Sequence, residues 1–317
     1  MRNVVIYGAA GFVASALLSR ASLPCHTLTL VDQRVIQQPL LDSLRQAGVS
    51  VNVVRSSSLD GIAAGEADVL LVLAGQTDVD QALADPALAF GANMAIAMES
   101  AQWWRRHAGA RLVYLSSDEV LGPSQTPLDE EAPLRPTQPY AASKAAAEMT
   151  LRCYSESYGL ELVVVRSCNL VGGRQRARKL IPTAVQSLAT GLPVPIFGDG
   201  LHRREYLAVD DLCEVLSHAM AEALPVGVYN CTSGTSLQTI EVVHIVAESL
   251  GVEPAIMRVK DRLVHDRSYA MDAFRLNVYG WNPAVTPADA IASAAAEMKS
   301  AWEKGEVLTH SRADTDP

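Results

Sequence analysis

Short apolar runs alternate with longer amphipathic segments through the first half of the chain. Runs of about four to eight apolar, β-branched residues are typical of buried strands, whereas apolar residues recurring every three or four positions are typical of helices. The strand-like runs are residues 3–7, 27–31, 49–54, 68–73, 112–115 and 160–166. Strands that alternate with helices predict parallel βαβ units. We therefore expect an α/β fold with a doubly wound parallel sheet.

The second half of the chain has a different pattern. From about Cys168 onward the apolar segments are shorter and are separated by glycine and proline, as in Gly191-Leu192-Pro193. Apolar residues at helical spacing predict three helices here, at residues 210–223, 236–250 and 287–302. A mixture of short strands and helices is typical of a smaller α+β unit.

These patterns divide the chain into two units. Residues 1–167 are expected to carry the doubly wound sheet, and residues 168–302 mainly a cap that binds the substrate. Residues from about 205 to 232 are expected to return to the first unit. Residues 303–317 are a polar tail.

A glycine-rich turn follows the first predicted strand, and a helical pattern begins directly after it. Gly8 permits the tight turn, and Gly11 lets the backbone approach a pyrophosphate at the positive end of the helix. The third glycine of this fingerprint is replaced by Ala14, which is still small. Asp32 ends the second predicted strand, where a carboxylate binds the ribose hydroxyls of adenosine and repels a 2′-phosphate. The turn predicts a Rossmann domain whose cofactor is NAD rather than NADP.

Candidate catalytic side chains follow the predicted strand at residues 112–115. Ser117, Asp118 and Glu119 come directly after it, and Tyr140 and Lys144 open an alanine-rich helix further on. Residues four apart share one face of a helix, so the phenol and the amine point the same way. A phenol with its ordinary pKa of about 10 is a poor base near neutrality, so a nearby ammonium is useful. Two adjacent carboxyls can act as acid and base if their surroundings separate their pKa values.

The composition narrows the classes of partner. The chain has 317 residues and a net charge of −9 without long blocks of one sign, which disfavours nucleic acid and anionic membranes as partners. The basic run at residues 174–179 is either a solvated loop or an anion contact. Five scattered cysteines without metal-ligand spacing predict reduced thiols and no metal site. No apolar run reaches about 18 residues and no signal-peptide pattern is present, so we expect a cytoplasmic protein without a membrane span.

Four longer strings are more specific than the glycine turn and the Tyr-x-x-x-Lys pair. They are Ser116–Val120, Asn169 with Lys179–Pro182, Pro193–Gly200 followed by Arg204, and Asp261-Arg262 with His265–Asp272. With the turn, they resemble the extended short-chain dehydrogenases/reductases, and within them the nucleotide-sugar 4,6-dehydratases. The resemblance covers nearly the whole chain. The Asp118-Glu119 pair matters most, because epimerases of the same family usually lack it.

The resemblance implies an NAD-dependent lyase and assigns catalytic roles. Tyr140, its pKa lowered by Lys144 and the cofactor, would take the proton of the sugar 4-hydroxyl while hydride passes to NAD. Ser117 would hydrogen-bond the same oxygen. Glu119 would then remove the C5 proton, and protonated Asp118 would protonate the departing C6 hydroxyl.

The resemblance also implies two sets of binding residues. Those expected around NAD are Gly8, Gly11, Phe12, Val13, Asp32, Gln33, Ser58, Leu59, Leu73, Ala74, Gly75, Thr77, Asn93, Tyr140, Lys144, Ser167 and Asn169. Those expected around a sugar nucleotide are Asp78, Ser117, Asn169, Lys179, Leu180, Arg204, Arg262 and His265. Relatives dimerise through two long helices, here about residues 86–107 and 140–158, so a homodimer is expected.

The chain also departs from the family pattern in the walls of the expected pocket. Ser58 replaces an acid that contacts adenine, and Gln76-Thr77-Asp78 replaces a Glu-Ser-His string. Ala208, Leu121 and Val171 replace tyrosines. These changes leave the tyrosine, the lysine and both carboxyls in place, so the reaction class is better specified than the sugar.

Three other functions are compatible with parts of this pattern. A 5,6-dehydratase would return hydride to C4 after water is lost and leave an exocyclic alkene on a nucleotide sugar or a nucleoside. A 4-epimerase or decarboxylase needs only the serine, tyrosine and lysine, and makes Asp118 and Glu119 redundant. A non-catalytic NAD-binding protein would need none of these groups.

Overall fold

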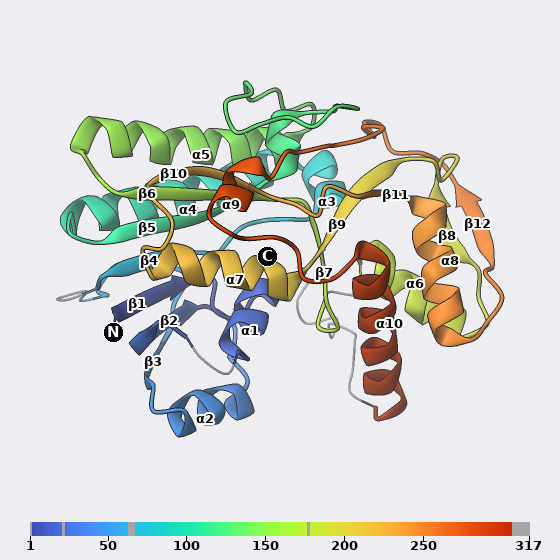
Figure 1. Cartoon of the computed structure of the whole chain (residues 1–317), viewed down its shortest axis with the longest axis horizontal. Coiled ribbons are helices and arrows are strands. Elements are labelled where there is room, and N and C mark those ends of the chain that lie inside the picture. Colours follow the sequence, from blue (N-terminus) through green and yellow to red (C-terminus); the bar gives the residue numbers. More distant parts are fainter. Residues whose placement is uncertain (1, 21–22, 63–66, 176–177, 306–317) are drawn as a thin grey trace.

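The computed structural model describes residues 2–20, 23–62, 67–175 and 178–305, and its largest part is a seven-stranded parallel sheet (Figure 1). The strands are β1 (Arg2–Tyr7), β2 (Cys25–Asp32), β3 (Ser50–Arg55), β4 (Val69–Val72), β5 (Arg111–Ser117), β6 (Leu162–Ser167) and β10 (Gly227–Cys231). Their order is β10-β6-β5-β4-β1-β2-β3, and each neighbouring pair is parallel. The chain winds outward in both directions from β1 and β4, which confirms the predicted doubly wound sheet.

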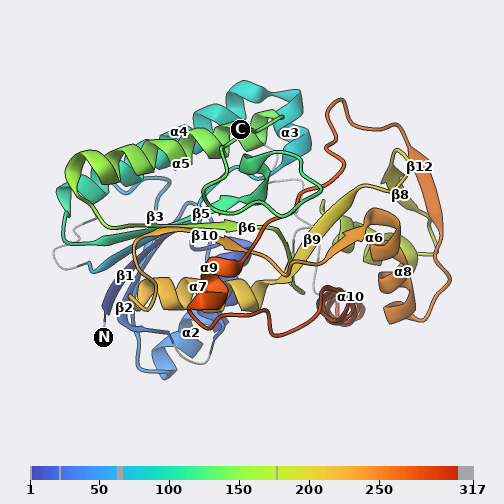
Figure 2. The ribbon, with the colours of Figure 1, turned by 45° about the horizontal axis from the view of Figure 1, so that its top comes forward.

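Helices cover both faces of this sheet (Figure 2). On one face lie α1 (Phe12–Leu18), α2 (Gln38–Gln46) and α7 (Val209–Met220); on the other lie α4 (Pro86–Arg106) and α5 (Pro139–Tyr158). Alternate strand residues enter opposite cores, because successive side chains of a strand point to opposite faces. Val4 and Ile6 belong to the α1–α7 core, whereas Val5 and Tyr7 belong to the α4–α5 core. Burial on both faces explains why the central strands β4, β5 and β6 are largely continuous apolar runs, whereas the edge strand β3 is exposed.

A smaller unit lies beside the carboxyl ends of the strands, at the right of Figure 1. It contains the parallel pair β8 (Val194–Phe197) and β12 (Ile256–Val259) and three helices, α6 (Leu180–Ala189), α8 (Thr239–Leu250) and α10 (Pro287–Glu303). One apolar core joins them, with Val185, Val243 and Ile291 fully buried. This unit is the α+β region expected after Cys168.

A three-stranded sheet joins the two units. Its strands are β7 (Asn169–Val171), β9 (Arg203–Ala208) and β11 (Ser236–Gln238), with β9 in the middle. β9 runs directly into α7, which is followed by β10 of the large sheet, so the return to the first unit occupies 209–231. The prediction of one helix over 236–250 is wrong in its first residues, because Ser236–Gln238 pair antiparallel with β9. The polar tail after residue 305 lies outside the described residues.

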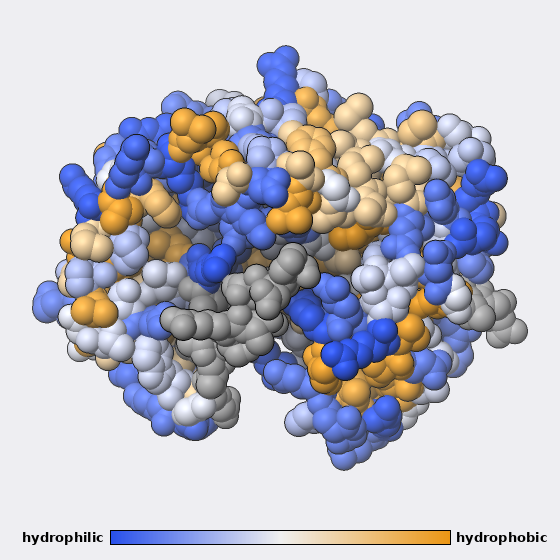
Figure 3. Space-filling view, turned by 180° about the vertical axis from the view of Figure 1, so that it is seen from behind, coloured by the Kyte–Doolittle hydropathy of each residue, from blue (hydrophilic) through white to orange (hydrophobic). Residues whose placement is uncertain are grey.

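The described helices include none that is long and apolar enough to cross a membrane. Seen from behind, the hydrophobic side chains form several separate groups among hydrophilic ones (Figure 3).

Candidate active site

A cleft of about 1000 Å³ runs between the carboxyl ends of the large sheet and the smaller unit. Its walls include the glycine turn after β1, the segment after β4, the end of β5 and the start of α5. The opposite wall is supplied by α6, β8, β9 and residues 262–269. Ligands of doubly wound folds bind at this edge of the sheet, where the strand order reverses.

The predicted carboxyl pair lies inside this cleft. β5 ends at Ser117, and a single turn of 3₁₀-helix, η1 (Asp118–Leu121), follows it. The Ser117 hydroxyl accepts a hydrogen bond from the Glu119 amide (3.3 Å) and donates to Asp118 Oδ1 (3.1 Å). Asp118 is 3% exposed, and its Oδ2 has no hydrogen-bond partner among the described residues. An orphaned buried carboxyl oxygen facing a cleft is expected to meet a ligand.

Gln138 connects Glu119 to the start of α5. Gln138 precedes Pro139 and is the N-cap of α5, where its Oε1 accepts a hydrogen bond from the Tyr140 amide (2.8 Å). Its Nε2 donates to Glu119 Oε2. One side chain therefore fixes both the helix that carries Tyr140 and the carboxylate expected to act as base.

Tyr140 and Lys144 lie on one face of α5, as their spacing predicts, and both line the cleft. Lys144 Nζ donates to the Leu115 carbonyl (2.7 Å) and lies 4.2 Å from the centre of the Tyr114 ring. Burial lowers the pKa of Lys144 to about 7.

The expectation that Lys144 and NAD together lower the pKa of Tyr140 stays a prediction, and the surroundings that the protein alone provides act in the opposite direction. Burial raises the pKa of Tyr140 well above its ordinary value, and the charges of Glu119 and Asp118 raise it further. A hydrogen bond with Ser117 is the one influence that lowers it. Ionising a buried phenol beside two carboxyls requires additional free energy, so Tyr140 stays protonated in the protein alone.

The two carboxyls are both harder to ionise than usual. Burial, and next the charge of Glu119, raises the pKa of Asp118 to about 8. Burial also raises the pKa of Glu119, but Arg204, Gln138 and Lys179 oppose this rise. The pair thus has unequal surroundings, with the proton favoured on Asp118 and the negative charge on Glu119.

The glycine turn has the shape that a bound dinucleotide requires. Gly8 has φ +92°, and a Cβ on it would lie 2.4 Å from the Ala74 amide nitrogen, so only glycine fits. Gly11 is the N-cap of α1, and its amide donates to the Gly8 carbonyl (3.1 Å). Phe12 and Val13 line the cleft beside it, as do Leu73, Gly75, Thr77 and Ser167. The turn fits the pyrophosphate of NAD, and the other residues line the cleft in which the rest of NAD would lie.

Asp32 is already engaged by its neighbours. Its carboxylate accepts hydrogen bonds from the Ala10 amide (2.9 Å) and from the amide and guanidinium of Arg34 (2.9–3.1 Å). Burial alone would raise the pKa of Asp32, but these bonds hold it below its ordinary value. Asp32 does not line the cleft, whereas Arg34 does. The predicted contact between Asp32 and the adenosine ribose therefore stays a prediction.

Four other predicted cofactor residues are not among those that line the cleft. Ser58 and the buried Leu59 both donate hydrogen bonds to Glu99 of α4. Asn93 accepts a hydrogen bond from the Gln76 amide (2.9 Å) and donates to Ser143 of α5 (2.8 Å), so it holds the segment after β4 against α5. The cleft lining also omits Gln33. Direct contact of these residues with NAD stays a prediction.

The predicted substrate residues face the catalytic ones across the cleft. Lys179 and Leu180 start α6, and Lys179 Nζ donates to the Thr77 carbonyl (3.0 Å). Arg204 of β9 donates to the Asp266 carbonyl (2.9 Å), and its guanidinium lies 4.6 Å from the centre of the Tyr269 ring. Asn169 and Asp78 line the same cleft, so all the predicted substrate residues are brought together. Of the basic run 174–179, residues 176 and 177 lie outside the described residues.

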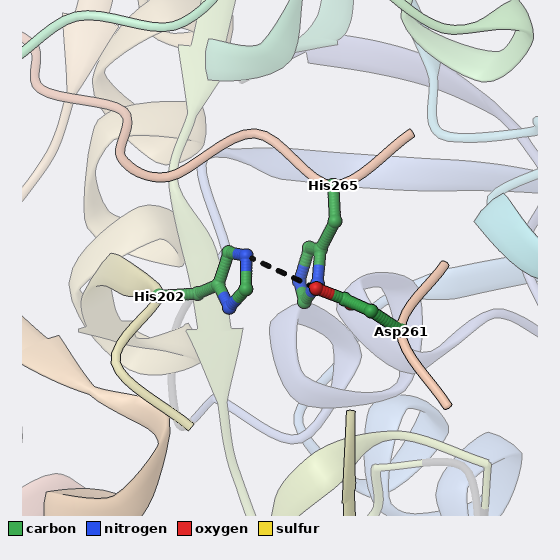
Figure 4. Close-up of side chains that lie close together, drawn as sticks. All are labelled: His202, Asp261 and His265. Atoms are coloured by element: carbon green, nitrogen blue, oxygen red, sulfur yellow. Dashed lines mark hydrogen bonds and ion pairs between the residues drawn. The ribbon is translucent and has the colours of Figure 1, made fainter. Parts of the chain in front are cut away.

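His265 belongs to a cluster with His202 and Asp261 (Figure 4). Its Nδ1 lies 2.6 Å from Asp261 Oδ1, and its ring stacks on that of His202 with centroids 3.5 Å apart and planes 11° apart. A metal ion lies in the ring plane of each histidine that binds it, at about 2.0–2.1 Å. Two parallel rings at this separation cannot both meet that condition, so the observed geometry disfavours a metal ion bound by both histidines.

Gln138, Arg34 and Asp80 line the cleft but are absent from the predicted site residues. Gln138 could have been found, because a polar residue directly before a proline at a helix start is a typical N-cap. Arg34 and Asp80 had no signal, because their roles depend on neighbours brought close only by the fold.

Comparison with known proteins gives three consistent findings. Residues 4–232 match the model of the NAD dependent epimerase/dehydratase family. A dTDP-glucose 4,6-dehydratase of Streptomyces griseus is 32% identical, over 95% of this chain and 96% of its own length.

Solved structures with the same fold include DesIV, a dTDP-glucose 4,6-dehydratase from Streptomyces venezuelae with NAD and TYD bound. It is 27% identical with a TM-score of 0.87, covering 98% of this chain and 100% of its own. They also include UDP-glucose 4-epimerase from Thermus thermophilus in complex with NAD. It is 27% identical with a TM-score of 0.81, covering 94% of this chain and 99% of its own.

Proposed function

Because the chain belongs to the NAD dependent epimerase/dehydratase family, we propose that it is an NAD-dependent dehydratase of a nucleotide-linked hexose. One observation carries this assignment beyond the family: the buried Asp118 and the half-buried Glu119 share the cleft with Tyr140 and Lys144. An epimerase or a simple dehydrogenase has no task for two such carboxyls. Removal of water requires one group to take a proton and another to give one.

NAD, when bound, supplies an acceptor for the C4 hydride and later returns it. Tyr140 takes the proton of the sugar 4-hydroxyl, with Ser117 hydrogen-bonded to the same oxygen. The raised pKa of Tyr140 in the protein alone means that nearby positive charge is needed for this step. Lys144 lies one turn along the same helix face and is the cation available from the protein.

Glu119 then removes the proton from C5, which the neighbouring 4-ketone has made acidic. Asp118, protonated near neutral pH, gives its proton to the departing C6 hydroxyl, which leaves as water. The bonds broken are C5–H and C6–O, and a double bond forms between C5 and C6. Arg204 and Lys179 favour the carboxylate form of Glu119 that this step needs.

We assign the substrate contacts to the far wall of the cleft. Lys179, Arg204, Arg262 and His265 place positive or protonatable groups along it. Arginine makes paired, charge-assisted hydrogen bonds with phosphate oxygens, which suits the diphosphate of a sugar nucleotide. The NAD-binding unit is then residues 1–167 with the returning segment, and the cap is mainly residues 168–302.

Substitution Glu119→Gln tests the base assignment. It keeps the size of the side chain but removes the charge, so water loss should fall by at least about 10²-fold while reduction of NAD by the sugar remains detectable. Product mass and the absorbance of reduced NAD measure the two steps separately. Glu253→Gln, at an exposed position outside the cleft lining, is the control. Full water loss by Glu119→Gln would disprove the role of Glu119.

Turnover in heavy water separates the competing reactions. In a 4,6-dehydratase the C4 hydride returns to C6 and a solvent proton is added at C5, so the product has lost water and carries deuterium at C5. A 5,6-dehydratase gives an alkene without a ketone. A 4-epimerase gives neither water loss nor deuterium. The test uses nucleotide sugars with different bases, because Asp78, one of the departures from the family pattern, lines the cleft, whereas Ala208 packs against the apolar core of the cap.

We also propose a cytoplasmic homodimer that forms through α4 and α5. The two helices lie side by side on one face of the sheet (Figure 2). They expose the apolar side chains of Leu88, Phe90, Met149 and Tyr158.

The cysteines support the cytoplasmic assignment. All five are free thiols, and four of them are buried, as is common in a reducing compartment.

A further inference from the structure

Three contacts cross the mouth of the cleft between the start of α3 (Val79–Ala84) and the cap. Lys179 donates to the Thr77 carbonyl, and Arg178 lies 3.7 Å from Asp78. Arg262 makes the third and closest contact, with Asp80. All these residues line the cleft.

The contact between Asp80 and Arg262 has the geometry of two parallel hydrogen bonds. Arg262 Nε donates to Asp80 Oδ1 (2.6 Å), and Arg262 Nη2 donates to Asp80 Oδ2 (2.9 Å). The guanidinium also lies 4.5 Å from the centre of the Phe197 ring. A carboxylate therefore occupies one complete edge of the arginine fork, in the way that a phosphate would.

The assignment of Arg262 to a substrate diphosphate, on which this inference rests, makes Asp80 a competitor. A diphosphate bound at Arg262 would bring its negative charge next to the Asp80 carboxylate. Like charges at such short range are unfavourable, and Asp80 is 54% exposed, so it is free to turn into solvent. Arg262, held over Phe197, is 26% exposed and has less room to move.

We propose that Asp80 is a specificity-determining residue that holds Arg262 in place in the empty cleft and is displaced by the diphosphate of the substrate. The ion pair keeps the guanidinium oriented toward the cleft, and it lowers the affinity of Arg262 for anionic ligands. A ligand with a single negative charge competes poorly with Asp80, whereas a diphosphate competes well. Asp80 thus selects for the more highly charged ligand.

Substitution Asp80→Asn in the NAD-loaded protein tests this inference by calorimetric titration with inorganic pyrophosphate and with thymidine diphosphate. An exposed ion pair of this kind is worth about a two- to five-fold change in an equilibrium constant, so both ligands should bind two- to five-fold more tightly. Inorganic phosphate should gain more than pyrophosphate, so that its disadvantage against pyrophosphate shrinks.

Two controls separate this effect from general charge and from structure. Asp60→Asn removes the same charge from an exposed aspartate paired with Arg106, outside the cleft lining, and should leave affinity unchanged. In an Arg262→Ala background, Asp80→Asn should give no gain, because the cation for which it competes is absent.

Unchanged or weaker anion binding by Asp80→Asn overturns the inference, as does failure of the unsubstituted protein to bind either ligand. The outcome is independent of turnover. Tighter pyrophosphate binding without dehydration of any nucleotide sugar would support the role of Asp80 and disprove the proposed function.

Discussion

Asp118 and Glu119 are adjacent in sequence yet have different surroundings. One buried oxygen of Asp118 has no hydrogen-bond partner in the described part of the chain, whereas Glu119 accepts a hydrogen bond from Gln138 and lies near the positive charge of Arg204. Because of these surroundings, Asp118 is the protonated member of the pair before a substrate binds. The residue types were readable in the sequence, but the unequal pKa values were not, because they depend on Gln138 and Arg204.

Water loss should depend on pH through Asp118. The pKa of Asp118 is raised to about 8, so the acid is protonated below that pH and loses its proton above it. The single-turnover rate of water loss should therefore fall about tenfold per pH unit well above pH 8. Asp118→Asn should remove this dependence and slow the step. A rate that stays level up to pH 10 would contradict the assignment of Asp118 as the acid.

The same raised pKa predicts a stability effect. Between the unfolded pKa of about 3.9 and the folded pKa of about 8, folding must either protonate Asp118 or bury its charge, so stability falls as pH rises through this range. Asp118→Asn should raise the free energy of unfolding at pH 7.5 by on the order of 1 kcal/mol, with little gain at pH 4. Thermal unfolding at both pH values measures this, and an equal effect at both would argue against the linkage.

The turn between β1 and α1 is the element most restricted by its surroundings. Gly8→Ala should destabilise the protein by about 2–4 kcal/mol and abolish NAD binding, because the new Cβ would overlap the Ala74 backbone. Gly48→Ala is a matched control: Gly48 has a similar φ of +83° but nothing within 4 Å of its Cβ position, so only about 1 kcal/mol of backbone strain is expected. Thermal unfolding with and without NAD gives both quantities, and similar losses in the two variants would contradict the steric argument.

Helices and strands with a clear hydrophobic pattern in the sequence were predicted well, and those that depend on a distant partner were not. The six predicted strands of the large sheet are all present: β1, β4, β5 and β6 are apolar runs buried on both faces, whereas β3 is an exposed edge strand found by its β-branched residues. β11 was hidden inside a helical pattern, because its three residues form a strand only by pairing with Arg203–Glu205. The sequence spacing placed Tyr140 and Lys144 on one face of α5, and the structure agrees.

At the scale of the whole molecule, the proposed dimer predicts that a substitution in its interface halves the mass of the particle in solution. Met149 is 59% exposed on α5, within the proposed α4–α5 interface. Met149→Arg should convert a dimer to a monomer, because a buried unpaired charge costs more than a typical interface residue contributes. Sedimentation velocity measures the mass. Val252→Arg, at a partly exposed apolar site on the cap, should remain dimeric; a monomeric unsubstituted protein would refute the interface.

The cleft itself could be predicted only in part. The sequence indicated which residues belong at the carboxyl edge of the sheet, because parallel strands end there together. It could not indicate that Arg262 meets Asp80, since 182 positions separate them and no local pattern links them. Long-range charge contacts of this kind are decided by the packing of the two units.

The position of β10 has a consequence for protein synthesis. β10 completes the large sheet beside β6, yet it is made only after β7, β8, β9 and α7 have been translated. A nascent chain that ends before residue 227 therefore presents β6 as an unpaired edge, which is a ready site for pairing with other chains. Ribosome-bound chains stalled before this point should recruit chaperones that leave once Gly227–Cys231 have emerged from the exit tunnel.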